Sequence, residues 1–270
     1  MWNEKPEGNG AHRARGEFMK FGLARFVTVL LSLNSGAAMA ADIRVIVGGP
    51  LPAVFKELGP QFERDTGHKL NASFGATAVV KRQIDDGATF DLIVTNTFAI
   101  EDWIKEGKLI AASRTPLAYA GLGLGVRAGA ARPDVSSAAA LRAALLGAST
   151  VGHGPESASA TSLQNVLARL GIADEMKPRL RPMGGGAIYK SVAGGEIDAI
   201  VAGVPGIVAA PGVDLAGAFP PELQTYVPFA AAVSAGARDP DAAQAFIRFL
   251  VSPAAAAVFR AKGLEPGAPR

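Results

Sequence analysis

The chain has 270 residues and no cysteine, and its 27 basic and 24 acidic residues give a formal net charge of +3. Five of the basic and three of the acidic residues lie within residues 1–40, which leaves 22 and 21, a charge near +1, for the rest. A nearly neutral chain without basic runs is not typical of nucleic-acid-binding proteins, and without cysteine it has neither disulfides nor thiolate ligands.

Metal and cofactor sites are not predicted. His68 and His153 each stand alone, with no second ligand at the spacing that a zinc site on one helix or strand would show. The third histidine, His12, lies in the N-terminal segment described next. We therefore expect no metal and no cofactor.

Residues 1–40 have the pattern of an export signal. Basic Lys20 and Arg25 precede an apolar run, residues 26–33, that is too short to span a bilayer, and a small-residue Ala-Met-Ala motif ends at Ala40. No second long apolar segment follows. We expect cleavage near Ala40, a periplasmic location and a soluble mature chain.

The start of translation has two interpretations. Met19 alone opens an ordinary signal sequence, so translation begins at either Met1 or Met19, and in the second case residues 1–18 are not translated. The apolar run could instead be a buried core helix. The flanking charge and the cleavage motif favour the signal.

From residue 41 onward, short β-type runs alternate with runs of helical spacing. In the first half, strands are expected at 43–47, 70–74 and 91–94, each followed by a helix that ends near Gly67, Gly87 or Gly107. In the second half, strands are expected at 149–152, 179–181 and 197–202, helices at 136–146, 160–170 and 187–193, and a terminal amphipathic helix near 242–249. This order is typical of an α/β protein with largely parallel sheets.

Two apolar segments are expected to cross between halves. Leu117–Val126 has glycine at 121, 123 and 125, a spacing that is not a dinucleotide-binding fingerprint, and Tyr226–Ser234 is a second strand-like run. The predicted fold is two-lobed α/β, with mostly parallel sheets flanked by helices and two crossing strands as a hinge. Lobe 1 is 41–116 plus 235–270, lobe 2 is 127–223, and the crossings are 117–126 and 224–234. We expect a monomer with its ligand in the cleft between the lobes.

Four turns between a predicted strand and the following helix consist of small residues. Helix starts offer free N–H groups and a positive dipole end, which bind anions without a charged side chain. Such residues also cap ordinary helices, but two equivalent turns in each half favour a ligand site. The predicted binding residues are Gly48, Gly49, Ala76, Thr77, Ser157, Ser159, Gly185 and Gly186.

Familiar catalytic motifs are absent from the sequence, which has no G-x-S-x-G elbow, P-loop or H-E-x-x-H. The chain is thus more consistent with a binding protein than with an enzyme. If it is an enzyme, the candidates for proton transfer near the cleft are His153, Glu156, Tyr189 and Lys190, with Lys81 as a further cation.

The stretches F-K-E-L-G-P-Q-F-E-R-D-T-G-H-K-L-N-A-S-F-G-A-T (55–77) and R-Q-I-D-D-G-A-T-F-D-L-I-V (82–94) resemble the molybdate-binding-protein-like periplasmic solute-binding proteins. Later stretches at 157–159, 194–199 and 245–253 resemble the same group. The resemblance implies a type II periplasmic binding protein that captures a small anion, an oxyanion or an organic carboxylate, and delivers it to an ABC transporter permease.

Two details of this resemblance point away from molybdate. Molybdate binders of the group present a hydroxyl residue in the first loop, where this chain has Gly48-Gly49, so a different anion is expected. Residues 211–224 and 263–266 are similar to a branch that includes aconitate isomerases. That branch implies an alternative function, an allylic proton shift on a tricarboxylate in the same cleft. A sensor without a transporter is a third possibility.

Overall fold

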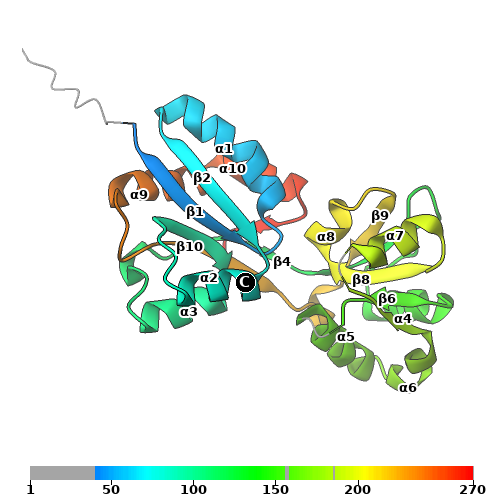
Figure 1. Ribbon diagram of the computed structural model, residues 1–270. Helices are drawn as coiled ribbons and strands as arrows, with labels where there is room; N and C mark the ends of the chain where they lie inside the picture. Colours follow the sequence, from blue (N-terminus) through cyan, green and yellow to red (C-terminus); the bar gives the residue numbers. More distant parts are fainter. Residues whose placement is uncertain (1–39, 156–157, 185, 270) are drawn as a thin grey trace, which may run out of the picture. The chain divides into compact units, whose positions relative to one another are not determined.

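The computed structural model describes residues 40–155, 158–184 and 186–269. The predicted export signal and the choice between Met1 and Met19 therefore fall almost entirely outside the described residues. Within the described chain, two β-sheets form two lobes, and helices flank each sheet (Figure 1).

The first sheet has six strands in the order β11-β4-β10-β3-β1-β2. They are β1 (Asp42–Gly48), β2 (Lys69–Gly75), β3 (Leu92–Asn96), β4 (Thr115–Ala120), β10 (Val227–Val233) and β11 (Glu265–Pro266). Strand β1 pairs in parallel with β2 and β3, whereas β10 is antiparallel to β3 and β4. The carboxyl ends of β1, β2 and β3 consequently lie at one edge of the sheet.

Alternating side chains of β1 divide the helices of this lobe between two faces. The helices are α1 (Pro52–Thr66), α2 (Thr77–Asp85), α3 (Thr97–Lys105), α9 (Pro240–Leu250) and α10 (Pro253–Ala261), with a short 3-10 turn at Ala111–Ser113. Val45 and Val47 belong to a core with α1, α9 and α10, and Ile46 belongs to one with α2 and α3. The rings of Phe62 and Phe246 lie 4.6 Å apart in the first of these cores.

The second sheet has five strands in the order β7-β6-β8-β5-β9. They are β5 (Leu122–Arg127), β6 (Val151–His153), β7 (Leu180–Pro182), β8 (Ala199–Gly203) and β9 (Val213–Ala218). The helices of this lobe are α4 (Ala138–Gly147), α5 (Ala158–Arg169), α6 (Ala173–Met176), α7 (Ala187–Gly194) and α8 (Val204–Val208), with 3-10 turns at Lys177–Arg179 and Pro221–Leu223. Helices α4, α5 and α6 share one core with the sheet, and α7 and α8 share another.

The predicted α/β class and two-lobed fold are confirmed, with two corrections. Each sheet is mixed rather than largely parallel, because β10 in the first and β5 in the second pair antiparallel to their neighbours. Leu117–Val126, expected as one strand, is two: β4 ends at Ala120 in the first sheet and β5 begins at Leu122 in the second. Helix α8 and strand β9 were not predicted. Residues 203–218 are rich in Gly, Pro and Ala, and their apolar residues follow neither the spacing of a helix nor the alternation of a strand clearly.

No single helix in the described part of the chain is long and apolar enough to cross a membrane. Helices α9 and α10 reach that length and composition only as a pair, with a bend of 64° between them.

Gln224 connects the two crossings of the chain. Its Oε1 accepts a hydrogen bond from the Leu122 N–H at 2.6 Å, and its Nε2 donates to the carbonyl oxygens of Leu122 at 2.9 Å and Phe219 at 3.2 Å. The side-chain amide thus bonds to Leu122 as a peptide unit of a neighbouring strand would. A Cβ at Gly121 would lie 2.6 Å from Nε2 of Gln224, so a side chain there would displace the Gln224 amide from these hydrogen bonds.

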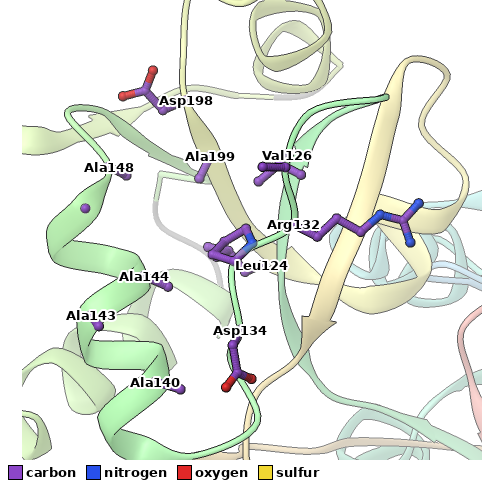
Figure 2. Close-up of a pocket in the computed structure, with 13 residues that line it drawn as sticks. Leu124, Val126, Arg132, Asp134, Ala140, Ala143, Ala144, Ala148, Asp198 and Ala199 are labelled. Atoms are coloured by element: carbon purple, nitrogen blue, oxygen red, sulfur yellow. The ribbon is translucent and has the colours of Figure 1, made fainter.

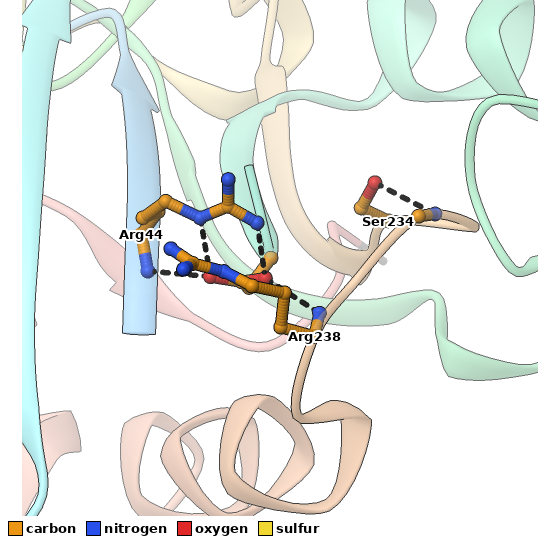
Figure 3. A network of polar contacts seen from close by, with 5 residues as sticks. Arg44, Ser234 and Arg238 are labelled. Carbon is orange, nitrogen blue, oxygen red and sulfur yellow. Dashed lines mark hydrogen bonds and ion pairs between the residues drawn. The ribbon is translucent and has the colours of Figure 1, made fainter. Parts of the chain in front are cut away.

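Asp91, directly before β3, is a buried carboxylate whose side chain is only 2% exposed. Its Oδ1 accepts from Nη2 of Arg44 at 2.7 Å and from the Arg238 N–H at 2.8 Å, and its Oδ2 accepts from the N–H and Nε of Arg44, both at 2.9 Å (Figure 3). Its carbonyl oxygen accepts from the Ser234 N–H at 3.0 Å. Burial by itself would raise the pKa of this carboxyl, but the hydrogen bonds from Arg44 and Arg238 outweigh it and hold the pKa of Asp91 well below its ordinary value. Asp91 therefore joins β1, β3 and the turn after β10.

Candidate functional site

A pocket of about 580 Å³ lies at the carboxyl edge of the first sheet and is lined from both lobes. The first lobe contributes Gly49, Pro50, Thr77, Asn96 and Phe98; the second contributes Ser162, Tyr189, Gly203, Pro205 and Gly206; Ala120, Gly121, Leu122, Thr225, Val227 and Phe229 complete the lining. Pockets at the strand ends of α/β sheets and between lobes are the usual ligand sites of such proteins.

A second cavity of about 650 Å³ lies in the second lobe, between β5, β8 and α4 (Figure 2). Leu124 and Val126 of β5 line it, together with the alanines of α4. At its rim, the carboxylate of Asp198 already accepts from the N–H groups of Ser149 and Thr150, at 2.7 and 3.0 Å. None of the residues predicted for binding lines this cavity, so the pocket at the strand ends is the candidate site.

Gly48 and Gly49 have different roles. Gly49 has a left-handed φ of 77° and lines the pocket, where a Cβ would lie 3.1 Å from the ring of Phe229. Gly48 is buried at the end of β1 outside the lining, and a Cβ there would lie 2.3 Å from Oγ1 of Thr95 and 2.9 Å from its Cβ. The Thr95 hydroxyl is buried and has no hydrogen-bond partner in the described chain. Close packing between β1 and β3 thus requires glycine at position 48.

Gly48→Ala is expected to lower the free energy of unfolding by about 1 to 3 kcal/mol, because the new methyl group overlaps a β-branched side chain fixed in the neighbouring strand. Chemical denaturation measures the effect. Gly147→Ala is the matched control, since a Cβ at the end of α4 meets no atom within 4 Å and should leave stability unchanged or slightly raised. Equal stability of the two variants would contradict the argument.

Thr77 and Asn96 bring the starts of α2 and α3 together. Thr77 is the first residue of α2, and Asn96 caps α3 through its Oδ1, which accepts from the Ala99 N–H at 3.0 Å. Nδ2 of Asn96 donates to Oγ1 of Thr77 at 3.1 Å. The Val79 N–H in the first turn of α2 bonds to the Ala76 carbonyl oxygen at 2.8 Å, and the N–H groups of the first two residues of each helix have no partner within their own helix. This wall of the pocket therefore presents hydrogen-bond donors.

Tyr189 of α7 forms part of the opposite wall. Its hydroxyl oxygen lies 2.3 Å from the position that a Cβ of Gly206 would take, so the absence of a side chain at Gly206 makes room for the phenol. Burial raises the pKa of Tyr189, which keeps the phenol protonated at neutral pH. The phenol of Tyr189 can therefore donate a hydrogen bond and is poorly suited to act as a base.

The predicted binding residues are only partly brought together. Gly49 and Thr77 line the pocket, and Ala76 directly precedes Thr77 as the residue before α2. Gly48 and Gly186 do not line it. Ser157 and Gly185, like the side chain of Ser159, lie outside the described residues.

Of the predicted proton-transfer candidates, Tyr189 alone lines the pocket within the described chain. His153, at the end of β6, is 9% exposed, and its Nδ1 donates to the carbonyl oxygen of Gly154 at 2.9 Å. Lys81 is exposed and pairs with Asp85 at 2.7 Å. Lys190 is exposed on α7, and Glu156 lies outside the described residues.

The described lining contains no Lys, Arg, His, Asp or Glu. Much of it is apolar, and Phe98 in the first turn of α3 is 68% exposed. Among the described residues, no group of three or more His, Cys, Asp or Glu side chains could hold a metal ion. The described lining thus offers neutral hydrogen-bond donors and apolar surface.

Several lining residues were missed by the sequence argument: Asn96, Phe98, Ser162, Gly203, Pro205, Gly206, Thr225 and Phe229. Asn96 could have been found, because it follows a buried strand and precedes a helix, as the predicted turns do. Gly206 carries no such signal, since its role depends on the ring of Tyr189 from another helix.

Comparisons with known proteins agree with this architecture. An aconitate isomerase from Pseudomonas sp is 26% identical over 246 residues, which cover 87% of this chain and 94% of that protein. The molybdate-binding protein ModA of Azotobacter vinelandii is 40% identical over 98 residues, 36% of this chain and 39% of that protein.

Solved structures show the same fold. The substrate-binding domain assigned to a molybdenum ABC transporter of Clostridium difficile superimposes with a TM-score of 0.73 at 19% identity, covering 85% of this chain and 100% of that one. A family model of bacterial extracellular solute-binding proteins matches residues 43–265. The chain belongs to the family of bacterial extracellular solute-binding proteins.

Proposed function

We propose that the protein binds a small anion, preferentially an organic carboxylate, in the pocket at the strand ends and delivers it to an ABC transporter permease. The observation that carries the proposal is the lining, which offers hydroxyl, amide and helix-start N–H donors without a fully charged side chain among the described residues. Such donors bind anions. The family match and the export pattern of residues 1–40 support a periplasmic location.

Apolar surface in the pocket favours an organic ligand over a bare oxyanion. Leu122 and Phe229 line the pocket but are only 4% exposed, so its apolar surface comes mainly from Phe98, which is 68% exposed, and from the partly exposed Pro50. A carbon skeleton would cover this surface, whereas an inorganic oxyanion would leave much of it in water. The Gly48-Gly49 turn, which has no hydroxyl, supports the same choice.

We expect cis-aconitate, trans-aconitate and citrate to raise the melting temperature of the purified protein. Molybdate, tungstate and sulfate should raise it less. A ligand at 100 times its Kd adds about 2.7 kcal/mol to the stability of the folded state. The cation putrescine is the control and should give no shift. A shift with putrescine and none with any of the anions would overturn the proposal.

The alternative is an isomerase that moves a proton across the allylic system of a tricarboxylate. It is favoured by the similarity to an aconitate isomerase along nearly the whole length of that protein. Such a reaction needs a base, but Tyr189, the titratable side chain of the described lining, has a pKa raised by burial and is better suited to donate. This favours binding without turnover. Chromatography of cis- and trans-aconitate incubated with the protein separates the two functions, because interconversion would establish the isomerase.

A further inference from the structure

Asn96 does more than cap a helix. A backbone N–H can only donate, so the side-chain atom that meets the Ala99 N–H is the oxygen Oδ1. The amide nitrogen Nδ2 is thereby turned toward Thr77, and its hydrogen bond to Oγ1 must run from Asn96 to Thr77. These two hydrogen bonds, from the Ala99 N–H to Asn96 and from Asn96 to Thr77, are called the relay below. The helix cap fixes the direction of both.

The relay determines what the Thr77 hydroxyl can do. Oγ1 accepts the hydrogen bond from Asn96 with one of its two lone pairs, so the hydroxyl keeps its proton and one further lone pair. Among the described residues, nothing accepts this proton. Thr77 lines the pocket, so the acceptor that fits is an atom of the ligand.

We propose that Asn96 is a positioning residue: its amide occupies one lone pair of the Thr77 hydroxyl and so orients the hydroxyl proton toward an acceptor of the ligand, such as an oxygen of an ionised carboxylate. The inference rests on the proposed function. The described lining contains no carboxylate that would accept a proton from a ligand.

Asn96→Asp separates the relay from the helix cap. Aspartate caps helices as well as asparagine does, and its charge is favourable at a helix start, so α3 should remain intact. Its second oxygen, however, can only accept. It would take the proton of Thr77 and turn the hydroxyl away from the ligand, in addition to repelling an anion.

The experiment is a double-mutant cycle with Asn96→Asp and Thr77→Val, read as the Kd for trans-aconitate and for sulfate by titration calorimetry. At neutral pH, each single variant is expected to weaken binding about tenfold or more. The loss caused by Asn96→Asp should be smaller in the Thr77→Val background, where only charge repulsion remains. Thr77→Ser keeps the hydroxyl and should bind nearly as the unchanged protein does.

A pH series supplies a readout that a purely structural role would not move. Binding of sulfate by Asn96→Asp should recover as the pH falls below about 4, because the protonated carboxyl can again donate to Thr77. An undiminished affinity of Asn96→Asp, or an equal loss with and without the Thr77 hydroxyl, would overturn the role of Asn96 and leave the proposed function intact. Failure of the unchanged protein to bind any of the anions would overturn the proposed function and this inference together.

Discussion

Asp91→Asn is expected to lower the free energy of unfolding by about 3 kcal/mol. The carboxylate is buried and accepts four hydrogen bonds, three from Arg44 and one from the Arg238 N–H. An amide nitrogen in place of one oxygen would face these donors and leave Arg44 without its counter-charge, a change that costs several kcal/mol in buried pairs. Urea denaturation, with the midpoint and slope both fitted, measures the effect.

The matched control is Asp214→Asn, which makes the same chemical change in an exposed pair. Asp214 contacts Arg132 at 2.9 Å, but their side chains are 31% and 58% exposed, so stability should change little.

The pH dependence of stability provides a second check on the role of Asp91. Because the folded-state pKa of Asp91 is depressed, its contribution is fully present above the unfolded pKa of about 4 and is lost as the pH falls toward the folded value. Asp91→Asn should therefore flatten the acid side of the stability profile, and an unchanged profile would contradict the argument.

Gly206→Ala is expected to weaken ligand binding by about 1 to 3 kcal/mol, roughly 10- to 100-fold. The new Cβ would lie 2.3 Å from the hydroxyl oxygen of Tyr189, so the phenol must move away from its position in the pocket. The backbone of α8 meets no comparable obstacle, and folding should be preserved. Titration calorimetry with the best anion of the thermal-shift series measures the loss.

Tyr189→Phe supplies the control for this prediction. Without the hydroxyl, the ring atom nearest to a methyl group introduced at position 206 is Cζ at 3.4 Å, an ordinary contact. Gly206→Ala should thus weaken binding strongly when Tyr189 is present and hardly at all in the Tyr189→Phe background. Equal losses in both backgrounds would show that Gly206 acts independently of the phenol.

Much of the fold could be predicted because local patterns and tertiary packing agree. In α1, for example, Val54, Phe55, Leu58 and Phe62 recur at helical spacing, and the helix ends at Gly67, which adopts a left-handed conformation. The mixture of parallel and antiparallel strands in each sheet could not be predicted. Local patterns show where a strand lies, but not which distant strand it pairs with. The glycine-rich run of residues 117–126 conceals a change of sheet at Gly121, next to which the Gln224 side chain hydrogen-bonds to the N–H and the carbonyl oxygen of Leu122.

The candidate site was predictable only where a residue's neighbours in sequence reveal its role. Thr77 and Gly49 follow strands and open turns, and both line the pocket. Asn96 has the same local signature, but its bond to Thr77 spans 19 positions and leaves no trace in the sequence. Gly48 shows the opposite case, since its local pattern suggested ligand contact, whereas its glycine is explained by the neighbouring Thr95.

The described lining contains no charged side chain, and this affects how ligand binding should depend on salt. Attraction between full charges weakens as ionic strength rises, because the Debye length shrinks from about 30 Å at 0.01 M salt to about 3 Å at 1 M. Hydroxyl, amide and helix-start N–H donors act over one hydrogen-bond length, inside that range at any of these concentrations. Under the proposed function, the affinity of the protein for its ligand should therefore change little with ionic strength.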